Sequence, residues 1–269
     1  MNDSLSSIAP VAEVVYRLSL THETSRRVAG QTLDTVSTAH AMPRAPPPVR
    51  DLLTCSGMNI LVFADDSSSM QAVSCTADVY KPTTRWMELK AMLEKLVTMM
   101  LVIDHAGFDL KFFNDPTWYN VQTVSSLDDL FASKGQPRGM TPLLSNLSPS
   151  LRSRYTRGDF PEADTLVLCL TDGQPSDTNM LGLARAVADR SSGVWVSFIM
   201  CTEEDAVVNA YEKLIDPLPG VDICDDYASE RAQCMKKKND LSFNMYLAKV
   251  SGFGCASDMT TVPGTSRQT

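Results

Sequence analysis

Apolar and polar positions along this chain form two repeating patterns. Short apolar runs are typical of strands buried in a sheet, and between them apolar residues recur every three or four positions, as in amphipathic helices. The predicted strands cover residues 59–65, 109–114, 164–172, 194–201 and 221–225, with an edge strand at 121–125. Helices are predicted at 84–105, from Ser126 as the capping residue, after Thr141-Pro142, at 178–192, at 204–215 and after the last strand.

This order of elements predicts an α/β fold. Helices between successive strands indicate βαβ units and a parallel sheet. The run 164–172 has almost no polar residue, as expected for a central strand buried on both faces, and we place it beside strand 59–65. The fold class is therefore α/β, with a doubly wound, mostly parallel six-stranded sheet flanked by helices. One buried stripe of the longest helix is predicted from Met87, Leu89, Met92, Leu93, Leu96, Val97 and Met100.

Three regions follow one another along the chain. Residues 1–50 are predicted to be a flexible N-terminal tail that ends in a proline-rich linker. Apolar residues between Val11 and Leu20 predict a short helix in this tail that docks on the domain or on a partner. Residues 51–257 are expected to form one folded domain, and residues 258–269 a flexible C-terminal tail.

Composition narrows the possible functions. The chain has 269 residues, 43% of them hydrophobic, which is enough for a full core. Its net charge of −8 argues against nucleic-acid binding, which needs a concentrated basic surface. The seven cysteines form no C-x-x-C pair, so neither a disulfide framework nor a zinc site is expected. Without a secretory pattern or an apolar stretch long enough to cross a bilayer, a cytoplasmic, reducing location is expected.

Oxygen-bearing side chains gather in three short segments. Asp65, Ser67 and Ser69 follow the first strand with D-x-S-x-S spacing, Thr141 stands in a G-x-T-P segment, and Asp172 stands in a T-D-G turn after a later strand. Each segment alone is better explained as a turn. In doubly wound sheets, however, ligands bind beyond the carboxyl ends of the strands. Because Mg²⁺ prefers oxygen ligands, the three segments together predict a magnesium site, with Mn²⁺ as an alternative.

These segments resemble the metal-ion-dependent adhesion site of von Willebrand factor type A domains. The resemblance implies a Rossmann-like fold of that family, in which the five residues above hold the metal. It further implies that an Asp or Glu from a partner protein completes the coordination, with no catalytic residue. Ser68 and Met140 stand where the family commonly has glycine, and neither change removes a ligand.

Other segments resemble the intracellular, copine-like branch of the same family. They are Arg85-Trp86, the residues from Gly107 to Asn114, and those from Asp225 to Arg231. The leading hypothesis is therefore an intracellular, non-enzymatic module that binds a partner protein through a divalent metal. The oligomeric state and the identity of the partner do not follow from the sequence.

Two other functions remain open. The domain could be a structural subunit of a larger assembly, with a metal site that only stabilises the fold. Alternatively, Asp65-Asp66 at a strand end resembles the start of magnesium-dependent phosphoryl hydrolases. Those enzymes need a second acid where Ser67 stands, and a lysine near the phosphate that no motif here supplies.

Overall fold

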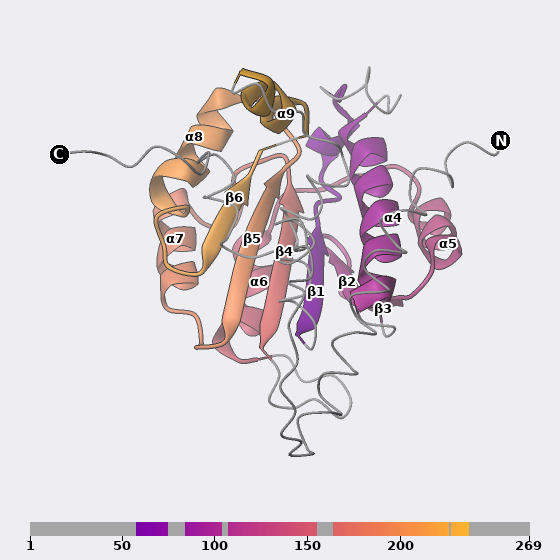
Figure 1. Ribbon diagram of the computed structural model, residues 1–269, viewed down its shortest axis with the longest axis horizontal. Coiled ribbons are helices and arrows are strands. Elements are labelled where there is room, and N and C mark those ends of the chain that lie inside the picture. The colour runs from indigo at the N-terminus through magenta and orange to yellow at the C-terminus, as the bar shows by residue number, and fades with distance from the viewer. Residues whose placement is uncertain (1–57, 75–83, 104–106, 155–163, 226, 237–269) are drawn as a thin grey trace, which may run out of the picture.

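The computed structural model describes residues 58–74, 84–103, 107–154, 164–225 and 227–236 (Figure 1). Its strands are β1 (Asn59–Ala64), β2 (Phe108–Phe112), β3 (Trp118–Val121), β4 (Thr165–Thr171), β5 (Val194–Met200) and β6 (Val221–Cys224). Its α-helices are α4 (Arg85–Ile103), α5 (Val124–Lys134), α6 (Leu143–Arg152), α7 (Met180–Ala188), α8 (Asp205–Leu214) and α9 (Tyr227–Lys236). A short 3₁₀ helix, η1 (Ser68–Gln71), follows β1.

The strands form one sheet in the order β3-β2-β1-β4-β5-β6. β1 lies inside the sheet and pairs in parallel with both β2 and β4, and β5 and β6 continue in parallel. Among the strands of the described residues, only the edge strand β3 is antiparallel, and it pairs with β2. The predicted fold class is therefore confirmed, and so is the placement of the strand at 164–172 beside the first strand.

Helices cover both faces of the sheet (Figure 1). On one face, α4 and α5 pack on a core that includes Val62 and Leu168. On the other face, α6, α7 and α8 pack on a core that includes Phe63 and Val167. Successive residues of a strand point to opposite faces, which explains why β4 is apolar along nearly its whole length.

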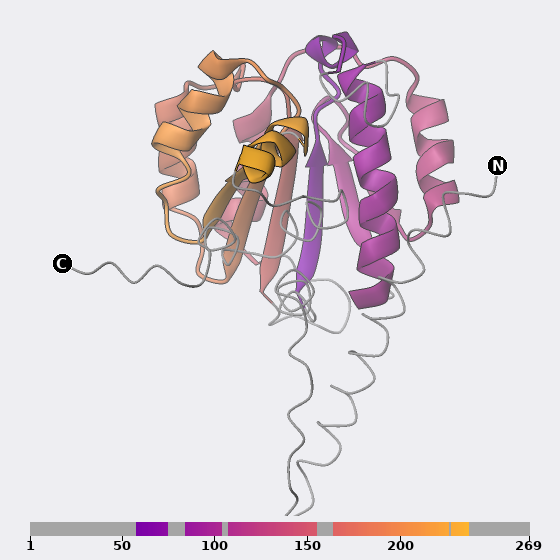
Figure 2. The same ribbon diagram turned by 45° about the horizontal axis from the view of Figure 1, so that its top comes forward.

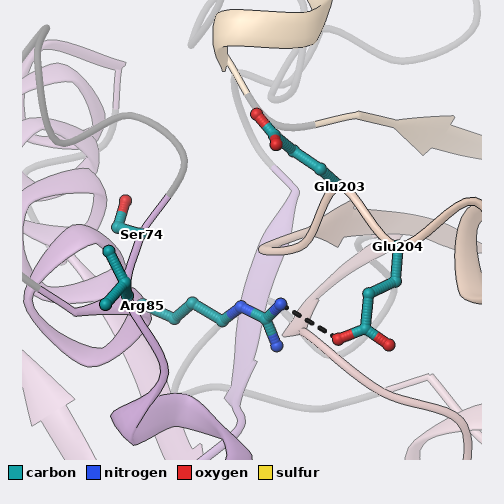
Figure 3. Close-up of a pocket in the computed structure, with 5 residues that line it drawn as sticks. Ser74, Arg85, Glu203 and Glu204 are labelled. Carbon is teal, nitrogen blue, oxygen red and sulfur yellow. Dashed lines mark hydrogen bonds and ion pairs between the residues drawn. The ribbon is translucent and has the colours of Figure 1, made fainter.

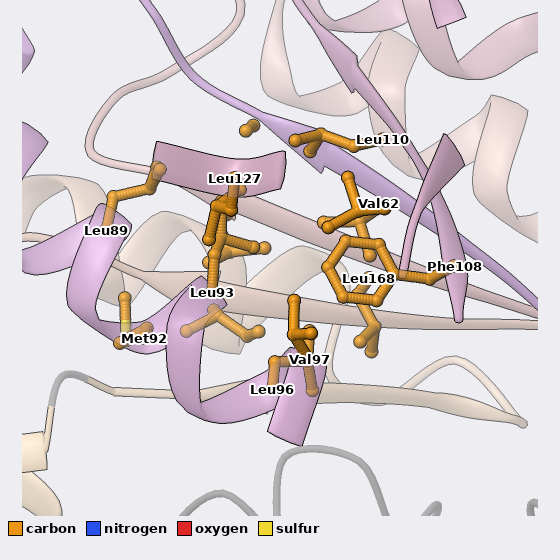
Figure 4. Close-up of a cluster of buried hydrophobic side chains, with 14 of the residues drawn as sticks. Val62, Leu89, Met92, Leu93, Leu96, Val97, Phe108, Leu110, Leu127 and Leu168 are labelled. Carbon is orange, nitrogen blue, oxygen red and sulfur yellow. The ribbon is translucent and has the colours of Figure 1, made fainter. Parts of the chain in front are cut away.

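The buried stripe of α4 supplies much of the first core. Figure 4 shows Leu93 and Val97 of α4 in one cluster with side chains of the sheet. The prediction was wrong for Met87, which is 48% exposed. Its neighbour Trp86 takes the buried position and packs on Phe131 with ring centroids 4.5 Å apart. Adjacent helix residues are about 100° apart, so only one of the two faces the sheet. Met100 belongs to the residues whose side chains are not described.

The boundaries of the edge hairpin also differ from the prediction. β3 ends at Val121, where the edge strand was expected to begin. The N-cap of α5 is Thr123 and not Ser126. The Thr123 hydroxyl accepts a hydrogen bond from the Ser126 N–H (3.0 Å), and Ser126 Oγ accepts one from the Thr123 N–H (3.3 Å). This reciprocal pair is a capping box with serine at its third helical position.

We expect Thr123→Ala to lower the free energy of unfolding by about 1 kcal/mol, because the Ser126 N–H would lose its acceptor. Urea denaturation followed by circular dichroism measures the change. Ser125 is an exposed serine on the same turn, so Ser125→Ala is a matched control that should have little effect. Equal losses in the two variants would show that the capping box is not responsible.

Several remaining predictions concern single residues or the ends of the chain. Cys169 and Cys201 are buried free thiols, as expected for cysteines in apolar strands. Within the described ranges, no helix has both the length and the apolar character to cross a membrane. The predicted tails at 1–50 and 258–269, and the predicted helix near Val11–Leu20, lie outside the described residues.

Candidate metal centre

The carboxyl ends of β1 and β4 meet at one edge of the sheet. Ala64 of β1 is paired with Leu170 of β4, and the Asp65 N–H donates to the Leu170 carbonyl at 2.9 Å. β1 then leads into η1, which lies beside the start of α4 (Figure 2). The segment that carries Ser67 and Ser69 is thereby brought to the turn that carries Asp172.

Asp65 is fully buried and is held from two sides. Its Oδ1 accepts a hydrogen bond from the Ser67 N–H (2.8 Å), and its Oδ2 accepts one from the Thr171 hydroxyl (2.7 Å). Burial raises the pKa of Asp65 from 3.8 to about 6, with a further contribution from the charge of Asp172, although these hydrogen bonds oppose the change. Burial is therefore the main cost of a charged Asp65.

A chain of oxygen atoms leads from Ser67 to Asp172. The hydroxyls of Ser67 and Ser69 are 2.9 Å apart, and Ser69 Oγ donates to Asp172 Oδ1 at 2.7 Å. Ser67 and Asp172 are buried, whereas Ser69 is exposed. The chain thus reaches the surface at its middle member, Ser69.

Thr141 approaches these groups from a third segment. Its carbonyl accepts a hydrogen bond from the Ser176 N–H (2.8 Å), which fixes its loop to the loop after β4. A Cβ built on Gly173 would lie 3.8 Å from Thr141 Oγ1, so the hydroxyl lies next to the T-D-G turn. The same loop is also fixed to η1, because the Ser68 N–H donates to the Gly139 carbonyl (3.2 Å).

Asp177 determines where α6 begins, directly after Thr141. Its carboxylate accepts hydrogen bonds from the N–H groups of Leu144 (3.1 Å) and Ser145 (2.7 Å). Burial alone would raise the pKa of Asp177, but these hydrogen bonds hold it below its ordinary value. Pro142 is the N-cap residue of α6.

Arg85 brings a cation to the site. From the first turn of α4, its Nη1 donates to Asp172 Oδ2 (2.8 Å) and its Nη2 donates to Glu204 Oε1 (3.1 Å). Burial alone would lower the pKa of Arg85, but Asp172 and Glu204 raise it. Both oxygens of Asp172 therefore have a donor, one from Ser69 and one from Arg85.

Asp66, the next residue after Asp65, belongs to a different cluster. Lys134 Nζ lies 3.0 Å from both Asp66 Oδ2 and Asp115 Oδ2. Asn114 donates to Asp66 Oδ1 from its backbone N–H (2.8 Å) and from Nδ2 (2.9 Å). Lys134 is thus paired with two carboxylates, and Asp66 belongs to this cluster instead of to the proposed ligands.

The structure brings the predicted residues together but adds others. Four of them are linked by hydrogen bonds, and Thr141 adjoins them through its loop. No group of three or more His, Cys, Asp or Glu in the described part of the chain is placed to hold a metal, so a cation here would depend on hydroxyls. Sequence reasoning assigned no role to Thr171, Arg85 or Glu204. Thr171 stood within the T-D-G turn, whereas nothing in the sequence pointed to Glu204.

Several solved structures are similar to this chain at low sequence identity. No family model and no curated protein matches the sequence. The VWA domain of SpRpn10 has a TM-score of 0.47 at 10% identity, over 62% of this chain and 87% of that one. An aerotolerance-related membrane protein from Bacteroides fragilis has a TM-score of 0.43 at 16% identity, over 67% and 97%. A von Willebrand factor type A structure from Catenulispora acidiphila has a TM-score of 0.39 at 18% identity, over 72% and 43%. These values are too low to identify a family or a function.

Proposed function

We propose that this chain is a metal-dependent protein-interaction module. In this proposal a divalent cation, Mg²⁺ or Mn²⁺, is held by Asp65, Ser67, Ser69, Thr141 and Asp172. An Asp or Glu side chain of a partner protein then completes its coordination. The main supporting observation is the hydrogen-bonded chain of oxygens from Ser67 to Asp172 beside the buried Asp65. The resemblance to copine-like von Willebrand factor type A domains is part of the same proposal.

The donor set fits a hard divalent cation. It consists only of carboxylate and hydroxyl oxygens, the ligands that Mg²⁺ and Mn²⁺ prefer. A cation would offset the cost of burying Asp65 as a carboxylate near Asp172, a cost seen in the raised pKa of Asp65. Because three of the five donors are neutral hydroxyls, the cation would keep much of its charge and attract a carboxylate from a partner.

Exposed apolar side chains beside the site offer contact area to a partner. Val73, which follows η1, is 79% exposed, and Met140, which precedes Thr141, is 67% exposed. Apolar contacts next to a polar anchor are usual in protein interfaces, where methionine is enriched. The partner segment that we propose therefore carries an acidic residue with apolar neighbours.

We expect one Mn²⁺ to bind per chain, as measured by electron paramagnetic resonance of the free ion. Ser69→Ala removes one exposed hydroxyl from the site and should weaken Mn²⁺ binding by about tenfold. Ser125→Ala is the control, because it removes an exposed hydroxyl from α5, which carries none of the five ligands. Affinity capture of a partner from the source extract should depend on the metal in the same way.

The outcomes separate this proposal from its main alternative. A partner recovered in Mg²⁺, but lost in chelator and with Ser69→Ala, supports the metal-dependent module. Equal recovery in all three samples would favour a structural subunit that is held by other surfaces. A native protein that binds no Mn²⁺ would contradict the proposed site.

A further inference from the structure

Arg85 affects any cation that would bind at this site. Its Nη1 lies 2.8 Å from Asp172 Oδ2, and the Asp172 side chain is 0% exposed. The other oxygen of Asp172 accepts a hydrogen bond from Ser69. A buried carboxylate that has both a positive partner and a hydroxyl donor is already neutralised. A metal that used Asp172 would have to share it with Arg85 or displace the guanidinium.

A second anion lies on the other side of the guanidinium. Arg85 Nη2 contacts Glu204 Oε1 at 3.1 Å, and the Glu204 side chain is 62% exposed. Figure 3 shows Arg85 extending from α4 toward Glu204, at a cavity of about 350 Å³ that Ser74 and Glu203 also line. The guanidinium therefore has both an alternative partner and space beside it.

We propose that Arg85 is a resident cation that competes with a divalent metal for Asp172, and that Glu204 favours the metal by holding the guanidinium. This inference rests on the proposed metal site. Without a metal, Arg85 stabilises the buried Asp172. With a metal, two cations next to one carboxylate repel each other, so Arg85 lowers the affinity for the metal. Asp172 then has two alternative counter-ions, the metal and Arg85. Arg85 lies at the start of α4 and also contacts Glu204 at the start of α8.

Binding of Mn²⁺ alone tests the role of Arg85. Arg85→Gln should tighten Mn²⁺ binding by about tenfold, because Asp172 would lose a charged hydrogen-bond partner that competes with the metal. Lys90→Gln is the matched control, since Lys90 lies on the same helix and is paired with Glu94 and Asp128 away from the site. The control should change the affinity by less than about twofold, as expected for an exposed ion pair.

The role of Glu204 predicts a change in the opposite direction. Glu204→Gln should weaken Mn²⁺ binding by about threefold, because Arg85 would keep only Asp172 as its charged partner. Glu203→Gln removes a negative charge at the same cavity, and Figure 3 shows that its carboxylate is turned away from Arg85. It should therefore have a smaller effect. When Arg85 is already Gln, the Glu204 and Glu203 substitutions should have equal effects.

The melting temperature gives a second test of the role of Arg85. Arg85→Gln should lower the melting temperature in chelator, and saturating Mg²⁺ should remove this deficit.

Equal Mn²⁺ affinities of the native protein and Arg85→Gln would overturn the competition but leave the metal site intact. Binding by Arg85→Gln alone would support the competition but contradict the function proposed for the native protein, whose site would be closed to metal. Binding by neither overturns both proposals. If Arg85→Gln does not fold, equal affinities of Glu204→Gln and Glu203→Gln would overturn the competition.

Discussion

Asp65→Asn should abolish metal binding and yet stabilise the metal-free protein at neutral pH. Asparagine keeps the shape of the side chain but removes its charge, so the affinity for Mn²⁺ should fall by about a hundredfold or more. In the metal-free protein the same charge is unfavourable, because Asp65 is fully buried and lies near Asp172. One substitution is thus expected to change the two properties in opposite directions.

The pKa of Asp65 determines whether Asp65→Asn raises or lowers the free energy of unfolding. The folded pKa of Asp65, about 6, lies above the value of 3.8 for an unperturbed aspartate. The folded state therefore holds this proton more tightly than the unfolded state. The contribution of Asp65 to the free energy of unfolding is most favourable below pH 3.8, falls as the pH rises to about 6, and is lost above that. Asp65→Asn removes this loss and should recover about 3 kcal/mol at pH 7.

Urea denaturation between pH 4 and 7.5, in chelator and in Mg²⁺, measures both effects. Mg²⁺ should stabilise the native protein by mass action and leave Asp65→Asn unchanged. Asp66→Asn is the control, since Asp66 is the adjacent carboxylate but is paired with Lys134 in another cluster. It should keep its response to Mg²⁺. A stabilisation of Asp65→Asn by Mg²⁺ would show that Asp65 is not needed to hold the metal.

The elements that were predictable from sequence are those whose pattern depends on burial. The apolar run of β4 indicated a strand covered on both faces, and the spacing of Leu89, Leu93 and Leu96 indicated the buried side of α4. Boundaries were less predictable, because they depend on which of several polar residues caps a helix. Thr123 and Ser126 are both good capping residues, and only their reciprocal hydrogen bonds distinguish the cap from the third helical position.

The proposed ligands and their surroundings differ in how far the sequence could reveal them. The ligands stand in short motifs, so residues two positions apart already suggest a common site. Arg85 lies 87 residues from Asp172 and 119 residues from Glu204 along the chain. Contacts at such separations arise from the order of strands in the sheet and leave no local pattern. Arg85 could therefore be identified as the counter-ion of Asp172 only from the structure.

A single methyl group at Gly139 should separate the loops that form the site. Gly139 has a φ of +106°, a backbone conformation that residues other than glycine rarely adopt. A Cβ there would lie 2.6 Å from Asn114 Oδ1, and Asn114 is itself held by Asp66. Gly139 also exchanges hydrogen bonds with Ser68, through its N–H (3.1 Å) and its carbonyl (3.2 Å). Gly139→Ala would therefore push the loop that carries Thr141 away from η1.

We expect Gly139→Ala to lower the free energy of unfolding by about 2–3 kcal/mol, from backbone strain together with the steric clash. Its Mn²⁺ affinity should fall by about tenfold, since the Thr141 hydroxyl would be displaced. Gly135 provides a matched control, because its φ is +70° but a Cβ there would have no neighbour within 4 Å. Gly135→Ala should cost about 1 kcal/mol and keep the metal. Denaturation and Mn²⁺ titration of both variants separate backbone strain from the clash. If both lost the metal equally, the fit between Gly139 and Asn114 would have no part in assembling the site.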